Sequence, residues 1–387
     1  MTRLLLVAGD SSGDRVAADF VRAYRARDPE ARFSGMAGPR MCEAGVRQVV
    51  SAEALAIGGF SAPLAAGTSL FRVWRAMARA LDAERPDLVV LIDSGGFNIP
   101  FAAHVRRRSS ARILYYVAPQ VWAWRRGRIR RLAARVDRIA LILPFEEAAY
   151  EGAAVRTDYV GHPLLDQIEA LPGDFDRPSA RQSLGIPESV KLVTLLPWSR
   201  RNEVDRHLGL QLAAARWIHA RESDVVFRVA VAPSLDPQSL RDAVAKAALP
   251  RSLDLECVDD RSLELLRAAD VALLKPGTAT LEASLLGCPM VVMGRIGRIS
   301  AALLRRIIRL PHLSMPNLLL GEAVVPELLQ RDAEPERLGQ AVLGLLSGPE
   351  RERQLENLER VREHLGRPGA AGRAAAIAGE LLGLAAA

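Results

Sequence analysis

Short apolar runs alternate with longer amphipathic segments along most of the chain. Leu4–Ala8 is a continuous apolar run that ends in a tight Gly/Ser turn, and Asp14–Arg27 then carries apolar side chains at helical spacing. The same alternation predicts further strands at Arg32–Met36, Asp87–Ile92, Arg112–Val117 and Arg138–Leu143, and a helix at Leu70–Leu81. Short strands that are apolar throughout and alternate with helices are typical of a parallel sheet covered on both faces.

The alternation stops near the middle of the chain and then begins again. Gly161–Pro187 is rich in Pro, Gly and Asp and is predicted to be a linker. Beyond it, strands are expected at Leu192–Leu196, Val225–Val231, Leu253–Val258, Val271–Leu274 and Met290–Met293, with helices at Glu203–Ala220 and Leu240–Ala248 and an all-helical end from about Pro335. Two successive α/β units predict two Rossmann-like domains whose parallel sheets face a cleft.

Composition supports this organisation. The 387 residues are 49% hydrophobic and 25% charged, which allows two domains and excludes wholesale disorder. The three cysteines are far apart, so neither a zinc site nor a disulfide framework is expected, and a reducing compartment fits. No run of about 18 apolar residues occurs, and the N-terminal apolar run is too short for a signal peptide. We therefore expect a soluble, cytoplasmic protein.

Polar and glycine-rich segments follow four of the predicted strands. They are Gly9–Asp14, Asp93–Asn98, Pro197–Arg201 and Lys275–Thr280. Open α/β sheets bind ligands beyond the carboxyl ends of their strands, so these segments are candidate binding loops. Each could also be an ordinary turn, since turns often need Gly and Pro.

The segment Lys275–Glu282 follows a strand and opens a helix. A helix N-terminus presents free N–H groups that suit a phosphate, Gly277 lets a ligand approach the backbone, and Thr278 and Thr280 add hydroxyls. Glu282 lies one turn further on, where a carboxylate could bind ribose hydroxyls. The alternative is a capped helix, with Thr278 as the N-cap and Glu282 as an acid of the first turn.

Three other side chains are candidates for chemistry. Arg200 lies at a strand end, where it could neutralise a diphosphate. Asp93 directly follows a buried strand and could act as a general base, or could simply cap the next turn. His162, in a Gly-His-Pro turn at the domain junction, is as readily structural as functional.

Positive charge is concentrated in two stretches that contain no acidic residue. Ten arginines lie between Asp93 and Asp137, together with Trp122 and Trp124, and five lie between Glu282 and Glu322. Basic surfaces that are partly apolar indicate an anionic membrane or lipid, although they could be solvated faces. No nucleic-acid-binding motif accompanies them, so nucleic acid is not expected as a partner.

Several strings, in the same order along the chain, resemble the lipid-A-disaccharide synthases. They are VAGDSSGD, MAGPRMCEAG, IDSGGFNIP, VAPQVWAWRRGRIRRL, LPFEEAAYE, YVGHPLLD, LLPWSRRNEV, GTATLEASLLGCPMVV and MPNLLLGEAVVPELLQ. The resemblance covers about Leu5 to Gln330, and WAWR, AGPRM and PNLL are specific strings rather than general Rossmann features.

The resemblance implies a GT-B fold, with a first domain at 1–165, a second at 186–365 and a last helix, about 366–387, that packs back on the first. It implies inverting transfer of 2,3-diacylglucosamine from UDP to 2,3-diacylglucosamine 1-phosphate, giving a β-1,6 disaccharide 1-phosphate and UDP. It implies no metal and no cofactor, and a peripheral position on the inner face of the cytoplasmic membrane. The oligomeric state stays open, with a homodimer among the options.

The matching motifs also assign residues. The resemblance implies that Asp93 is the general base. Nucleotide-binding residues would be Ser199, Arg200, Gly277, Thr278, Glu282 and Asn317, and substrate-binding residues would be Asp10, Ser12, Gly13, Asp14, Gln120, Trp124 and His162.

Four positions depart from the family pattern. Gly95 and Gly96 replace a Pro-Asp pair, Trp198 replaces a glycine, and Asp10 stands where Glu is usual. Gly96 and Trp198 keep open a non-catalytic relative that binds a UDP-sugar or lipid. A UDP-HexNAc 2-epimerase is a further alternative on the same architecture, although it needs more acid and base residues than the candidate loops supply.

Overall fold

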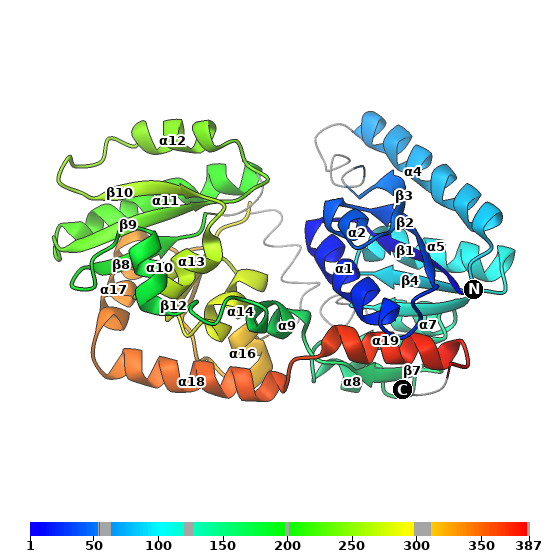
Figure 1. Ribbon diagram of the computed structural model, residues 1–387. Coiled ribbons are helices and arrows are strands. Elements are labelled where there is room, and N and C mark those ends of the chain that lie inside the picture. Colours follow the sequence, from blue (N-terminus) through cyan, green and yellow to red (C-terminus); the bar gives the residue numbers. More distant parts are fainter. Residues whose placement is uncertain (53, 55–62, 120–126, 198–200, 298–310, 385–387) are drawn as a thin grey trace. The chain divides into compact units, whose positions relative to one another are not determined.

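The computed structural model describes residues 1–387 except 53, 55–62, 120–126, 198–200, 298–310 and 385–387. The chain divides into two compact units, one formed by Met1–Glu169 with Arg367–Ala387 and the other by Ala170–Gly366. Each unit holds one parallel sheet with helices on its faces (Figure 1). The prediction of two Rossmann-like, parallel-sheet domains is confirmed.

The sheet of the first unit has seven strands in the order β3-β2-β1-β4-β5-β6-β7, and every pair is parallel. The strands are β1 (Arg3–Ala8), β2 (Arg32–Ala37), β3 (Arg47–Ser51), β4 (Leu88–Ile92), β5 (Arg112–Tyr116), β6 (Arg138–Leu141) and β7 (Arg156–Tyr159). The edge strands β3 and β7 were not predicted, because their sequences, RQVVS and RTDY, are largely polar and only partly buried.

The central strands are buried on both faces, so successive side chains of one strand enter two separate cores. In β1, Leu4 and Leu6 join the core beneath α1 (Ser11–Arg25), whereas Leu5 and Val7 join the core beneath α4 (Pro63–Glu84) and α5 (Gly95–Arg108). The other helices of this unit are α2 (Pro39–Glu43), α7 (Gly127–Ala133), α8 (Glu146–Ala149), α9 (Pro163–Glu169) and α19 (Ala370–Leu381).

The C-terminal helix α19 belongs to the first unit, where it packs on α1. Its Ala374 and Ala378 are fully buried in the core shared with α1. The carboxylate of Asp166, in α9, accepts hydrogen bonds from the backbone N–H groups of Gly369, Ala370 and Ala371 at the start of α19. These bonds satisfy donors that a helix N-terminus leaves without partners.

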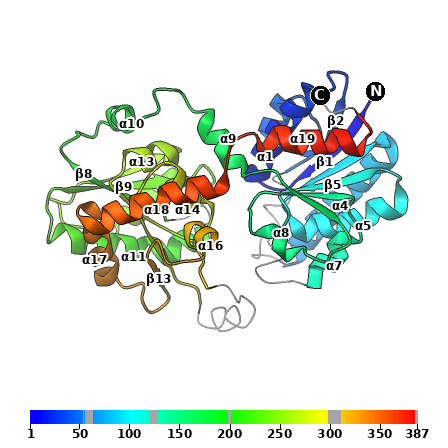
Figure 2. The same cartoon turned by 90° about the horizontal axis from the view of Figure 1, so that it is seen from below.

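The sheet of the second unit has six parallel strands in the order β10-β9-β8-β11-β12-β13. The strands are β8 (Lys191–Leu195), β9 (Val225–Val231), β10 (Leu255–Asp259), β11 (Val271–Leu274), β12 (Met290–Gly294) and β13 (Glu327–Leu329). The helices are α10 (Arg177–Ser183), α11 (Arg201–His219), α12 (Pro237–Ala245), α13 (Ser262–Ala268), α14 (Thr278–Leu285), α16 (Met315–Leu320), α17 (Pro335–Leu346) and α18 (Pro349–Leu365). Figure 2 shows α18 crossing this unit beside α14 and α16, which it contacts.

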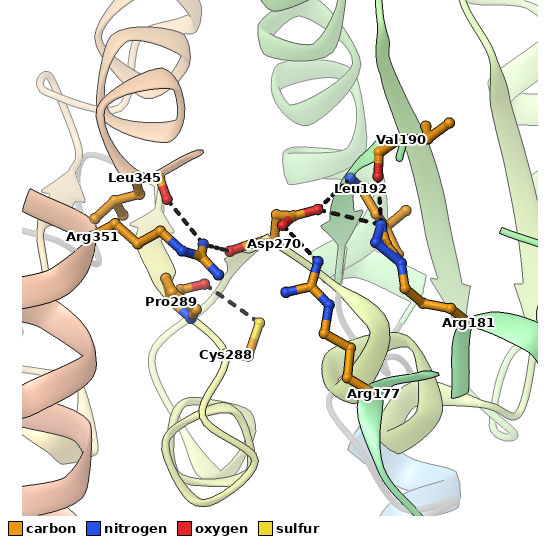
Figure 3. A network of polar contacts seen from close by, with 9 residues as sticks. All are labelled: Arg177, Arg181, Val190, Leu192, Asp270, Cys288, Pro289, Leu345 and Arg351. Carbon is orange, nitrogen blue, oxygen red and sulfur yellow. Dashed lines mark hydrogen bonds and ion pairs between the residues drawn. The ribbon is translucent and has the colours of Figure 1, made fainter. Parts of the chain in front are cut away.

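The predicted linker at Gly161–Pro187 was wrong in one respect, because the segment includes the helices α9 and α10. Asp176 caps α10 by accepting a hydrogen bond from the backbone N–H of Ser179 at 2.9 Å. Arg177 and Arg181 of α10 then bind the carboxylate of Asp270, just before β11 (Figure 3). Charged partners outside the segment therefore order it, and its composition gave no sign of them.

Asp270 also links other parts of the second unit. Its carboxylate accepts a hydrogen bond from the backbone N–H of Leu192 at 2.8 Å, and its carbonyl accepts one from Arg351 at 2.6 Å (Figure 3). Nearby Cys288 is buried, which raises the pKa of its thiol to about 12 and keeps it protonated. This network lies at the amino-terminal ends of β8 and β11, so it supports the sheet at the edge opposite the candidate loops.

Candidate active site

Asp93 lies where β4 ends, at the carboxyl edge of the first sheet. Its φ is +46°, that of Ser94 is +40° and that of Val117, at the end of β5, is +58°. Left-handed backbone is uncommon for residues other than glycine and is a real outlier for a β-branched residue such as Val. Such strain is of order 1–3 kcal/mol per residue and tends to cluster at functional sites. The strained residues of β4 and β5 meet directly, since the Asp93 N–H donates to the Val117 carbonyl at 3.1 Å.

The Asp93 carboxyl is an unusually weak acid for an aspartate. Its pKa is raised to about 6, first by burial and then by the negative charge of Asp10, while a hydrogen bond from the Ser94 backbone acts in the opposite direction. At pH 7 the group is ionised yet more basic than an ordinary carboxylate. Those are the properties that a general base at a sheet edge requires.

Asp10 and Gly13 form the turn between β1 and α1. Asp10 is the N-cap of α1, and its carboxylate accepts a hydrogen bond from the Gly13 N–H at 2.7 Å. A Cβ on Gly13 would lie 3.2 Å from that carboxylate and 3.7 Å from Ile92, so a side chain here would crowd the turn against β4. Ser12 is exposed in the first turn of α1. The Gly/Ser turn therefore places Asp10 beside Asp93, as their electrostatic interaction shows.

Asp14 has a structural role that the sequence did not suggest. It is 3% exposed, and its carboxylate accepts hydrogen bonds from the backbone N–H groups of Gly38, Arg40 and Met41 at 2.9, 3.0 and 3.1 Å. A Cβ on Gly38 would lie 2.5 Å from this carboxylate. The final Asp of VAGDSSGD and the Gly of AGPRM are therefore explained by one contact that fastens α1 to α2.

His162 is neutral near pH 7. Burial lowers the pKa of its imidazole to about 4, and Asp166 opposes that shift only partly. Its Nδ1 accepts a hydrogen bond from the backbone N–H of Leu164 at 3.1 Å, so the ring proton is on Nε2. In this form His162 can donate a hydrogen bond through Nε2 but is a poor base.

In the second unit, α14 begins directly after the glycine turn. Gly277 is the N-cap with φ +138°. Among the described residues, a Cβ there would meet only Lys275, at 3.9 Å, which leaves this backbone open to a ligand. Thr278 is the first helical residue and is exposed. The alternative in which Thr278 caps the helix is therefore wrong. Glu282 is half-buried in the following turn.

Thr280 joins the start of α14 to the start of α16. Its hydroxyl donates to the Gly277 carbonyl at 2.7 Å and accepts from the Met315 N–H at 3.0 Å. The sequence offered Thr280 as a second hydroxyl for a phosphate, but its side chain is fully buried and its hydroxyl is used in these two bonds. Nothing in the sequence indicated the contact with Met315.

Asn317, predicted to bind the nucleotide, is 1% exposed and uses its amide within the protein. Its Nδ2 donates to the Val325 carbonyl and to Glu327, both at 2.9 Å, and its Oδ1 accepts from the N–H groups of Val324 and Val325. These four bonds use both N–H groups and both lone pairs of the amide. Asn317 therefore fixes the turn from α16 to β13, and Glu327 reinforces it by accepting from the N–H and hydroxyl of Ser314.

Four predicted site residues lie outside the described residues. They are Gln120 and Trp124 in the first unit, and Ser199 and Arg200 in the second, where Trp198 also falls. Seven of those that the structure describes form two groups: Asp10, Ser12, Gly13 and Asp93 at the edge of the first sheet, and Gly277, Thr278 and Glu282 at the start of α14. The other three, Asp14, His162 and Asn317, make the internal contacts given above.

Some of the positive charge in the acid-free stretch after Asp93 is neutralised by acidic side chains from outside the stretch. Arg106 and Arg112 both pair with Asp137, and Arg108 pairs with Asp82 on α4. Arg106 and Arg112 are thus partly neutralised by the aspartate that ends the stretch. Trp122 and the arginines at 125, 126, 298, 305, 306 and 309 lie outside the described residues.

Comparison with known proteins relates this chain to one family. A family model described as lipid-A-disaccharide synthetase matches residues 4–380. The lipid-A-disaccharide synthase of Syntrophus aciditrophicus (strain SB) is 38% identical over 376 residues, which are 97% of this chain and 96% of that protein.

Solved structures share the fold at much lower identity. A putative UDP-N-acetylglucosamine 2-epimerase from Listeria monocytogenes has a TM-score of 0.68 and 14% identity, covering 98% of this chain and 96% of that one. The glycotransferase of kitacinnamycin has a TM-score of 0.62 and 17% identity, covering 98% and 99%. Both an epimerase and a glycosyltransferase thus share this fold, so the fold alone does not distinguish the two activities.

Two Rossmann-like units with parallel sheets define the GT-B class of glycosyltransferase folds. Within that class, sequence identity over nearly the whole length decides the family. The chain belongs to the lipid-A-disaccharide synthetase family and is a glycosyltransferase.

We expect the Asp93 carboxyl to titrate near pH 6. Asp10→Asn removes the negative charge that contributes to the raised pKa, so the midpoint should fall. It should remain above an ordinary aspartate value of about 4, because burial is the larger cause. A carbon-13 NMR titration of aspartate-labelled protein, with Asp93→Asn to assign the resonance, measures both values. A parent midpoint near 4 would contradict the burial argument.

Proposed function

We propose that the chain transfers 2,3-diacylglucosamine from its UDP donor to 2,3-diacylglucosamine 1-phosphate, with inversion at the anomeric carbon. The products are the β-1,6-linked disaccharide 1-phosphate and UDP. Family membership supports this substrate pair, and within this chain the proposal depends on one observation: a half-buried carboxylate with a raised pKa on a strained turn at the sheet edge.

In the proposed mechanism Asp93 takes the proton of the acceptor 6-hydroxyl as its oxygen attacks the anomeric carbon of the donor. The new C–O bond forms on the face opposite UDP, the bond from that carbon to the diphosphate oxygen breaks, and UDP leaves with the electron pair. Asp93 ends the step protonated. Asp10, Ser12 and Gly13 line the same edge and would contact the acceptor, and His162, neutral at pH 7, would donate a hydrogen bond.

The nucleotide would bind to the second unit at the start of α14. Gly277 and Thr278 would offer backbone N–H groups and a hydroxyl to the diphosphate, and the half-buried Glu282 would accept hydrogen bonds from the ribose. Ser199 and Arg200 are proposed diphosphate ligands on family grounds, as are Gln120 and Trp124 for the acyl sugar. Asn317 would act indirectly, by holding the turn after α16 in place.

The departures at Gly95 and Gly96 do not oppose this function. A Cβ on Gly96 would meet nothing within 4 Å among the described residues, so the loss of a carboxylate there reflects no shortage of space. A Cβ on Gly95 would lie 2.7 Å from Pro119, which explains why the proline of the family pattern does not fit here. Asp93 remains as the carboxylate of this segment.

Asp93→Asn should lower the transfer rate by at least about a hundredfold, because general base catalysis typically contributes 10²–10⁴-fold. UDP affinity should be unchanged, since Asp93 lies in the unit that does not bind UDP in this proposal. In the parent, transfer should fall as the pH drops through about 6, where the base becomes protonated. The measurement is UDP release with and without the acyl-glucosamine 1-phosphate acceptor.

The same assay distinguishes the alternatives. Transfer requires the acceptor, an epimerase would convert the UDP-sugar without it, and a non-catalytic binding protein would do neither. Near-parental transfer by Asp93→Asn would move the base elsewhere, while inactivity of the parent with the acyl-glucosamine acceptor would favour the binding protein.

Glu282→Ala should weaken UDP binding about tenfold or more, because a hydrogen bond to a charged group is worth roughly 1.5–3 kcal/mol. Isothermal titration calorimetry of UDP gives the change in Kd. Glu264→Ala, on α13 of the same unit, is a control that removes a carboxylate distant in sequence from the proposed nucleotide contacts. Equal UDP affinity in Glu282→Ala and the parent would remove Glu282 from the site.

We also propose that the protein binds peripherally to an anionic membrane surface. In the described part of the chain no helix is long and apolar enough to cross a bilayer. On α4, however, Leu70 and Phe71 are 48% and 59% exposed. Exposed Arg72, Arg75 and Arg79 follow on the same helix. Apolar side chains beside arginines suit the boundary between lipid headgroups and acyl chains.

Binding to vesicles that contain anionic lipid should weaken as salt is raised, because the charges are screened within about 10 Å at 0.1 M salt. Leu70→Ser with Phe71→Ser should weaken it by at least about tenfold, since burying even one such apolar side chain contributes on the order of 1.5–3 kcal/mol. Leu384→Ser, an exposed leucine beyond α19, is the matched control. Equal binding to neutral and anionic vesicles in a flotation assay would count against the electrostatic part.

A further inference from the structure

The peptide unit of Asp93 is held from both sides. Its N–H donates to the Val117 carbonyl at 3.1 Å, as described above. Its carbonyl accepts two hydrogen bonds, from Asn98 Nδ2 at 3.0 Å and from the Tyr115 hydroxyl at 2.5 Å. Both lone pairs of that carbonyl are therefore used by side chains from different elements. The side chains of Asn98 and Tyr115 therefore hold the strained backbone of Asp93 in its left-handed conformation.

Asn98 is fully buried in the first turns of α5, and its side-chain amide donates hydrogen bonds to more than one backbone carbonyl. Nδ2 also donates to the Ile92 carbonyl at 3.0 Å, so a single amide group fastens the last residue of β4 and the residue after it. The backbone N–H of Asn98 in turn donates to the Ser94 carbonyl at 2.9 Å. The left-handed residues Asp93 and Ser94 are thus enclosed by contacts with one asparagine.

Tyr115 contributes from the neighbouring strand β5. Its ring is buried in the core on the α4 and α5 side of the sheet, and its hydroxyl reaches the carbonyl of Asp93. Burial raises the pKa of this phenol well above its usual value, so the hydroxyl remains a donor at any pH at which the protein works. The next residue, Tyr116, points into the opposite core, and its buried hydroxyl has no hydrogen-bond partner among the described residues.

We propose that Asn98 and Tyr115 are positioning residues for the transfer reaction: together they hold the left-handed peptide of Asp93 and thereby fix the direction of its carboxylate. This inference rests on the proposed role of Asp93 as the base. A residue with positive φ projects its Cβ differently from one in a strand or helix, so relaxation of this peptide would turn the carboxylate away from its position. A displacement of about 1 Å in a reacting group can cost on the order of a hundredfold in rate.

The pH dependence of the rate distinguishes positioning from simple support of the fold. The titratable groups that face Asp93 in the described part of the chain are Asp10, from the turn after β1, and Tyr115, from β5. Burial is the main reason that Asp93 is a weak acid. A carboxylate released from its fixed position gains water, so its pKa falls towards the ordinary value and the acid limb of the rate profile moves to lower pH.

Tyr115→Phe tests this inference with little change in packing, because only the hydroxyl is removed. We expect kcat at the pH plateau to fall about tenfold or more. KM for the UDP-sugar and for the acceptor should change less than about twofold, and the acid limb of the kcat profile should move to lower pH. Asn98→Ala should change the rate and the acid limb in the same directions. Tyr116→Phe, the same substitution one residue along β5, should leave both as in the parent.

Three results would overturn the inference, and they differ in what else they affect. If Asp93→Asn is inactive while Tyr115→Phe and Asn98→Ala match the parent, positioning fails and the base assignment stands. If Tyr115→Phe lowers kcat equally at every pH with the acid limb fixed, its role is structural. If Asp93→Asn itself retains near-parental transfer, the base assignment and the positioning role fail together.

Discussion

Burial of the central strands on both faces is the constraint on which the rest of this structure depends. A parallel strand covered on two sides favours apolar side chains, because a polar one buried there needs a partner. The ends of the strand are where polar side chains can remain hydrated. In β4 every residue from Leu88 to Ile92 is fully buried, and Asp93 follows at once. The same rule places Gly277 and Thr278 after β11. Candidate chemistry therefore gathers at strand ends because the sheet excludes it elsewhere.

Most conspicuous acids of the chain serve the backbone rather than a reaction. Asp14, Asp166 and Asp270 each accept hydrogen bonds from N–H groups distant in sequence. Each carboxylate satisfies donors that a helix start or strand edge leaves without partners, and thereby joins segments that are far apart in the sequence. Spacing in the sequence cannot reveal such acceptors, because their donors belong to backbone that carries no residue-specific signal.

These two features, buried strands and contacts with distant backbone, explain which parts of the structure the sequence predicted and which it missed. Fully apolar strands such as Val271–Leu274 were predicted to the residue, since periodicity reports burial directly. The edge strands β3 and β7 were missed because they are largely polar and only partly buried. The helix α10 was missed because Asp270 orders it from 89 or more positions away in the chain. The motif order identified the family, yet it could not show that the amide of Asn317 is fully used inside the protein, or that Thr280 connects two helices.

Asp93 differs from these structural acids because the protein binds mainly its backbone, whereas in the others it binds the carboxylate. In Asp14 the carboxylate is occupied, and the backbone is ordinary helix. In Asp93 the main-chain N–H and carbonyl are bonded to Val117, Asn98 and Tyr115. Its half-buried carboxylate has a backbone hydrogen bond from Ser94 and a repelling neighbour in Asp10. A carboxylate that served the fold would be stabilised in its charged form and would have a lowered pKa. The raised pKa of Asp93 means that the surrounding protein keeps this carboxylate receptive to a proton, and the strained peptide keeps it in place.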